Sequence, residues 1–153
     1  MSSNITGSGP VLANEDLDAF ERRTGRVIPA PYRAFLLQHN GGYPDPSDFL
    51  IKGDGQTPEL MGTVEQFLGV GTDDEYAEME RYLTLYRDRI PGDYFPIAQD
   101  PGGNVICMAT EGTDAGKIYF WDHEEEAEEG QPASRQNLYL VASGLEEFLQ
   151  HLR

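Results

Sequence analysis

The sequence predicts a single α+β domain. Helix-type spacing of apolar residues appears near both ends of the chain and once in the middle, and short strand-type runs separated by turn residues lie between them. No internal repeat and no long linker divides the 153 residues. With 39% hydrophobic and 10% aromatic residues, a chain of this length has enough core-forming side chains to fold as one unit.

The N-terminal segment differs in composition from the rest of the chain. Residues 1–13 are polar and rich in Ser and Gly, so we expect a flexible leader there and a domain over residues 14–153. The leader has no basic region followed by an apolar one, and no later stretch approaches the length of a membrane span. Cys107 is the single cysteine and has no partner for an internal disulfide. We therefore predict a cytoplasmic protein.

Two helices are expected after the leader. Asn14 or Asp16 is suited to cap the first helix, and Gly25 ends it. Pro31 is well placed to open the second helix, which ends at the glycines 41–42 because they permit a sharp turn. The apolar positions that give these helices a buried face are Leu17, Phe20, Tyr32, Phe35 and Leu36.

The middle of the chain combines loop, strand and helix signals. Residues 43–58 are typical of a loop that is broken by a short strand at 49–51, and residues 63–70 are a second strand candidate. A third helix opens with the acidic residues 73–75, which suit the positive end of a helix dipole, and ends before 91–92. Its buried positions are Met79, Tyr82, Leu83 and Tyr86.

The second half of the chain predicts an antiparallel meander. Strand-type runs occupy residues 95–98, 104–109 and 117–121, and a turn lies at 100–103. The highly charged segment 122–130 is expected to form a mobile loop. A strand at 138–141 and a helix from Ser143 complete the predicted domain. The buried stripe of that helix is Leu145, Phe148, Leu149 and Leu152.

The net charge limits the possible partners. Eleven basic against 27 acidic residues give a formal charge of −16, which repels nucleic acid phosphates and anionic lipid headgroups. A field of this sign favours a basic protein partner, because electrostatic attraction accelerates encounter. The alternative interpretation is that the negative charge only keeps the protein soluble.

No local motif indicates catalysis, a cofactor or a metal. The chain has no Gly-x-Ser-x-Gly elbow, and residues 100–104 are too short for a phosphate-binding loop and precede a strand. His39, His123 and His151 lack a second ligand at metal-binding spacing. We therefore expect a protein without an active site, cofactor or metal. A third hypothesis, besides the two binding functions, is an enzyme whose active-site carboxylates are brought together only by the fold and leave no local motif.

Several segments in a fixed order resemble the SMI1/KNR4, or SUKH, superfamily. The matching segments are residues 27–29, 32–37, 40–42, 95–98, 100–107 and 116–123, together with Glu147-Phe148-Leu149 in the last helix. The resemblance spans the chain from about Leu17 to the C-terminus. It implies a mixed, mostly antiparallel sheet flanked by helices. In bacteria it implies an immunity protein encoded beside a polymorphic or contact-dependent toxin, whereas eukaryotic relatives are regulatory scaffolds.

The leading hypothesis is an immunity protein that binds and neutralises a cognate toxin, such as a basic nuclease. The alternative is a non-enzymatic regulatory scaffold of the SMI1/KNR4 type. We expect a monomer or weak homodimer whose carboxylates attract the partner. The candidate partner-binding residues are Asp73, Asp74, Glu75, Glu124, Glu125, Glu126, Glu128 and Glu129.

Overall fold

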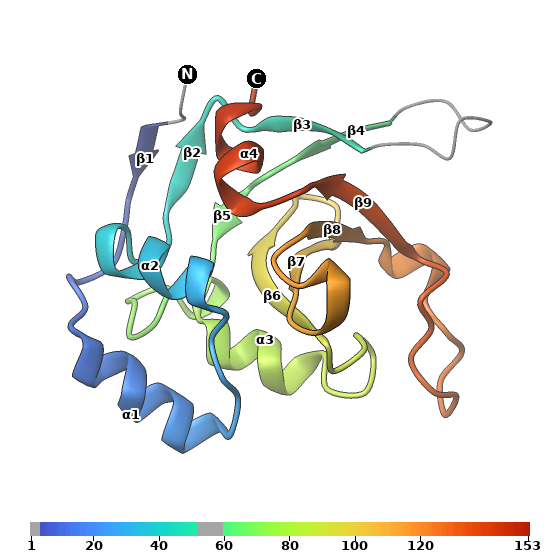
Figure 1. The fold of residues 1–153 in the computed structure, drawn as a ribbon, viewed down its shortest axis with the longest axis horizontal. Coiled ribbons are helices and arrows are strands. Elements are labelled where there is room, and N and C mark those ends of the chain that lie inside the picture. Colours follow the sequence, from blue (N-terminus) through green and yellow to red (C-terminus); the bar gives the residue numbers. More distant parts are fainter. Residues whose placement is uncertain (1–3, 52–59) are drawn as a thin grey trace.

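The computed structural model describes residues 4–51 and 60–153. Over these residues the fold is α+β, with helices around antiparallel sheets (Figure 1). The α-helices are α1 (Asn14–Thr24), α2 (Ala30–Gln38), α3 (Met79–Leu85) and α4 (Leu145–Gln150). The strands are β1 (Asn4–Thr6), β2 (Tyr43–Asp45), β3 (Asp48–Ile51), β4 (Leu60–Thr63), β5 (Gln66–Phe67), β6 (Tyr94–Gln99), β7 (Val105–Ala109), β8 (Ile118–Trp121) and β9 (Leu138–Ala142).

The main sheet has five strands in the order β5-β6-β7-β8-β9, and every neighbouring pair is antiparallel. The predicted meander is therefore confirmed, and Cys107 in its centre lies opposite Pro96 on one side and Tyr119 on the other. All five residues of β7 are buried, as expected for a central strand covered on both faces.

The predicted strand over residues 63–70 is wrong in one respect, because two strands occupy this region. β4 ends at Thr63 and pairs with β3, whereas β5 pairs with β6. The change of partner occurs over two residues: the Val64 N–H donates to the Ser47 carbonyl, and the Glu65 N–H donates to the Gln99 carbonyl. A single apolar run thus serves two sheets. Part of the predicted 43–58 loop, residues 52–58, lies outside the described residues.

The segment expected as a flexible leader is attached to the domain over its described part. β1 pairs with β2, the Gly9 N–H donates to the Asn40 carbonyl, and the Asn40 side chain donates to the Pro10 carbonyl. Gly42 permits this close approach, since a Cβ atom there would lie 2.7 Å from the Thr6 carbonyl oxygen. The second helix ends at Gln38, before the predicted glycines, and Gly42 instead makes room for the N-terminal strand.

The core joins α2 to the main sheet. Phe35 and Leu36 are buried, as the sequence predicts, and Ile97 and Trp121 of the main sheet are buried as well. The hydroxyl of the fully buried Tyr32 lies within hydrogen-bond distance of the Leu68 and Ile97 carbonyl oxygens. These contacts fix the helix against β6. No helix among the described residues is long and apolar enough to cross a membrane.

The C-terminal end of α1 agrees with the sequence prediction, but its N-cap position is occupied by Ala13 and not by Asn14 or Asp16. Asn14 is the first helical residue, and the Asp16 carboxylate caps the helix from its first turn by accepting the Ala13 N–H at 2.8 Å. Gly25 ends the helix with a φ of 71°, a conformation that glycine adopts without strain.

Candidate protein interaction site

The first acidic segment, residues 73–75, does not open α3 directly. Glu75–Ala77 form a separate 3-10 turn, in which the Asp74 carboxylate accepts the Tyr76 N–H at 2.9 Å, and α3 begins only at Met79. Asp74 thus caps a 3-10 turn, whereas the sequence predicts that residues 73–75 open the third helix itself. Glu75 lies 3.9 Å from Arg81, while Asp73 is exposed and has no side-chain partner among the described residues.

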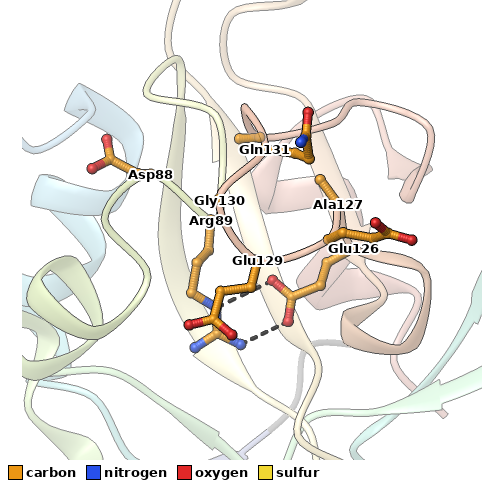
Figure 2. A pocket seen from close by; sticks show the side chains of 9 residues that line it. Asp88, Arg89, Glu126, Ala127, Glu129, Gly130 and Gln131 are labelled. Carbon is orange, nitrogen blue, oxygen red and sulfur yellow. Dashed lines mark hydrogen bonds and ion pairs between the residues drawn. The ribbon is translucent and has the colours of Figure 1, made fainter.

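The second acidic segment follows β8 and contains more structure than the predicted mobile loop. His123–Glu125 form a 3-10 turn capped by Asp122, and the Glu125 carboxylate accepts the Tyr139 hydroxyl proton. Glu126 forms two hydrogen bonds with Arg89, of 3.1 Å from Nε and 2.8 Å from Nη2 (Figure 2). The segment is therefore tied to the body of the domain by its first residues.

Arg89 is the main anchor of this acidic segment. Its guanidinium carbon lies 4.6 Å from the centroid of the Tyr86 ring and 5.9 Å from that of Trp121, so the cation contacts two aromatic faces. The hydrogen bonds from Glu126 raise the pKa of Arg89 above its ordinary value. In the sequence, Arg89 is a basic residue near the predicted end of a helix. It lies 37 residues from Glu126, and no local pattern indicates that the two side chains are in contact.

A hollow of about 610 Å³ lies between the end of α3 and the acidic segment. Asp88 and Arg89 line one side, and residues 126–131 with Ala133 line the other (Figure 2). Glu128 and Glu129 are exposed at this hollow and have no side-chain partner among the described residues. The surface is thus a negatively charged rim around one neutralised cation.

The eight predicted residues do not form one patch. Residues 73–75 precede α3, and residues 124–129 lie against the segment that follows α3 (Figure 1). The structure therefore places the candidate residues in two acidic surfaces at opposite ends of one short helix. Their role in binding remains a prediction.

The turn at 100–104 connects the main sheet to the second acidic segment. The Asp100 carboxylate accepts the N–H groups of Gly102 and Asn104 and the Asn104 side-chain amide, at 2.7 to 3.0 Å. The Asn104 side-chain oxygen in turn accepts the His123 N–H at 3.0 Å. The predicted turn at 100–103 is confirmed, and its hydrogen bonds through Asp100 and Asn104 also position the start of the acidic segment.

Cys107 and the three histidines have different neighbours. Cys107 is fully buried, and burial raises the pKa of its thiol well above the ordinary range, which keeps it protonated and unreactive. The rings of His39 and His151 lie beside Phe35 and Glu147, and that of His123 lies near Gly103. Among the described residues, no three His, Cys, Asp or Glu side chains are arranged to hold a metal ion.

Comparisons with known proteins agree with the fold and the sequence motifs. The chain is 31% identical over 155 residues to the SPbeta prophage-derived uncharacterized protein YokK of Bacillus subtilis (strain 168), an alignment that covers 91% of this chain and 73% of the relative. A crystal structure of a protein from Pseudomonas syringae pv. tomato shares the fold with a TM-score of 0.52 and 17% identity, over 84% of this chain and 82% of that one. The model of the SMI1 / KNR4 family (SUKH-1) matches residues 12–151. The predicted resemblance is thus confirmed, and the chain belongs to the SMI1/KNR4 family.

Proposed function

We propose that this protein is an immunity protein that neutralises a cognate toxin domain by binding it. The carrying observation is the match to the SMI1/KNR4 family over residues 12–151, because members of this family are often immunity proteins and generally act as non-enzymatic interaction proteins. The arrangement of the candidate residues supports binding, since exposed carboxylates gather in two places on an α+β scaffold.

The acidic surfaces suit a basic toxin domain, for example a nuclease with a positively charged substrate cleft. Asp73, Glu124, Glu128 and Glu129 are exposed and free of side-chain partners among the described residues, so they are available to attract such a domain. Attraction of this kind accelerates encounter by about 10- to 1000-fold at low salt. A small number of buried contacts would then provide most of the affinity.

The test is growth of cells that express the toxin domain encoded beside this gene, with and without the protein. Neutralisation restores growth, and the purified pair forms a stoichiometric complex whose association slows as salt rises. Equal killing in both strains would refute the proposal for that toxin. Capture of many unrelated proteins without any neutralisation would instead favour the regulatory scaffold.

Two double variants distinguish the effect of the carboxylates at the hollow from the effect of the total charge of the protein. Glu128→Gln with Glu129→Gln removes two charges from the rim of the hollow, whereas Glu15→Gln with Glu65→Gln removes two exposed charges elsewhere. We expect the first variant to associate with the toxin domain about three- to tenfold more slowly at low salt, and the second to change little. Equal effects would mean that only the total charge matters.

A further inference from the structure

A second hollow lies away from the acidic surfaces. It has a volume of about 600 Å³ and is lined by residues 25–31, from the connection after α1 and the start of α2, by residues 109–111 and 115–116 at and after the end of β7, and by Gly92. None of the eight candidate acidic residues lines it. We refer to it as the Arg26 groove.

Arg26 is an unusual cation in this protein. Its guanidinium lies 5.5 Å from the centroid of the Phe95 ring and 3.4 Å from the Gly92 carbonyl oxygen, and no carboxylate oxygen of the described residues lies within 4.0 Å of it. Burial and the neighbouring Arg87 lower the pKa of Arg26. Glu111 also lines the groove, but it forms no ion pair with Arg26. The Arg26 guanidinium is thus a partly desolvated positive charge without an ion-pair partner among the described residues.

The other partly buried cations differ in this respect. Arg33, Arg89 and Lys117 are exposed to a similar intermediate degree, and each has a carboxylate at 2.7, 2.8 and 2.9 Å, respectively. The chain has 27 acidic and only 11 basic residues, so carboxylates are abundant. Removing an unpaired charge from water is costly, and an external carboxylate at Arg26 would offset that cost.

The residue next to Arg26 offers apolar and backbone contacts in the same groove. The side chain of Val27 is 75% exposed. Its N–H and carbonyl groups have no hydrogen-bond partner among the described residues. Pro29 restricts Ile28 to extended conformations. The N–H groups of Arg26 and Ile28 already donate to the side chains of Thr24 and Glu21, so that Val27 is the residue of this stretch with free backbone groups. An extended peptide could therefore pair with it, as peptides do with free strand edges.

We propose that the Arg26 groove binds an extended peptide segment of a protein partner, with an Asp or Glu carboxylate of that segment on Arg26 and an adjacent apolar side chain on Val27. The guanidinium suits this role because it donates two parallel hydrogen bonds to a carboxylate. This proposal does not depend on a toxin, since it concerns a surface distinct from the two acidic ones.

The test is a titration of the ¹⁵N-labelled protein with the peptide acetyl-Ala-Leu-Asp-Leu-Ala-amide and with its Asn analogue, followed by NMR. We expect the Asp peptide to shift the amide signals of residues 25–28 and 110–116, and the Asn analogue to bind about tenfold more weakly. Absence of shifts at a peptide concentration of about 10 mM, or equal binding of both peptides, would overturn the proposal.

Two variants and one control assign the effect to the groove. Arg26→Met keeps the aliphatic stem and should abolish the preference for the Asp peptide, whereas Arg22→Met, at an exposed arginine of α1, should preserve it. Val27→Asp introduces a competing carboxylate at an exposed position and should abolish binding with the fold intact, which provides a test if Arg26→Met does not fold. Retained preference in either groove variant would refute the assignment. The peptide titration does not measure neutralisation of a toxin, so a negative result would overturn the groove proposal and leave the proposed function unaffected.

Discussion

Replacement of Arg89 by Ala tests how the second acidic segment is held. The substitution removes the two hydrogen bonds to Glu126 and both aromatic contacts, with Tyr86 and Trp121. The ion pair is partly exposed, with 40% of the Arg89 side chain and 25% of the Glu126 side chain accessible, so it contributes at most about 1 kcal/mol. The ring contacts together add about 0.5–1 kcal/mol. We therefore expect Arg89→Ala to lower the free energy of unfolding by about 1–2 kcal/mol.

Urea unfolding and hydrogen exchange provide the two measurements. The midpoint should fall with an unchanged slope, because the exposed surface of the unfolded chain is the same. Exchange of the amides at residues 126–131 should accelerate, since local opening becomes easier without the anchor. Glu126→Gln should reproduce most of the faster exchange but less of the lost stability, because the ring contacts of Arg89 remain.

The control for this prediction is Arg87→Ala, which removes the same charge at an exposed position with no carboxylate within 4.0 Å among the described residues. It should change the free energy of unfolding by no more than about 0.5 kcal/mol. If Arg89→Ala behaves like this control in both measurements, the ion pair does not hold the segment and the reasoning is refuted.

Four further outcomes are expected. Tyr32→Phe should destabilise by about 1–3 kcal/mol in urea, because the buried Leu68 carbonyl loses its partner, and a change within error would contradict that hydrogen bond. Asp100→Ala should cost about 2 kcal/mol, since three hydrogen bonds to the turn disappear; an unaltered midpoint would show that the turn forms without them. Burial raises the pKa of Tyr82 to about 12, so the folded state retains this proton more strongly than the unfolded chain. Stability should therefore fall as the pH rises from about 10 through 12, and Tyr82→Phe should reduce that fall, whereas an identical alkaline profile would exclude Tyr82 as its source. Finally, Cys107 should react with a thiol reagent only after unfolding, and rapid labelling of the native protein would disprove its burial.

The sequence predicts the meander well because its signals are local. Aromatic and β-branched runs separated by Gly, Pro and Asp specify strands and turns within a few residues of each other. The turn at 100–103 is an example, since Asp100 binds backbone groups only two and four residues away. Neighbouring antiparallel strands then follow from short connections.

The errors concern contacts between distant parts of the chain. The change of partner at Val64 depends on Ser47 and Gln99, which no local pattern brings together. The N-terminal strand β1 forms only because it pairs with β2, and the paired residues Thr6 and Tyr43 are far apart in the sequence. The pair of Arg89 and Glu126 spans 37 residues, so spacing gives no sign that the acidic segment is anchored.

Several of the carboxylates that make up the net charge are already bound within the fold. Asp74, Asp100 and Glu126 bind groups within the fold, and Glu78 accepts the N–H groups of Gly71 and Thr72. Their hydrogen bonds already orient them, so they are less available to a partner than the formal charge of −16 suggests. The exposed carboxylates without a described side-chain partner are therefore the better candidates for partner contacts, and they include Asp73, Glu124, Glu128 and Glu129. A partner that uses them would meet charges held at both ends of α3 by neighbouring capped turns. Specificity would then come from the spacing of the two surfaces, because total charge alone attracts any basic protein.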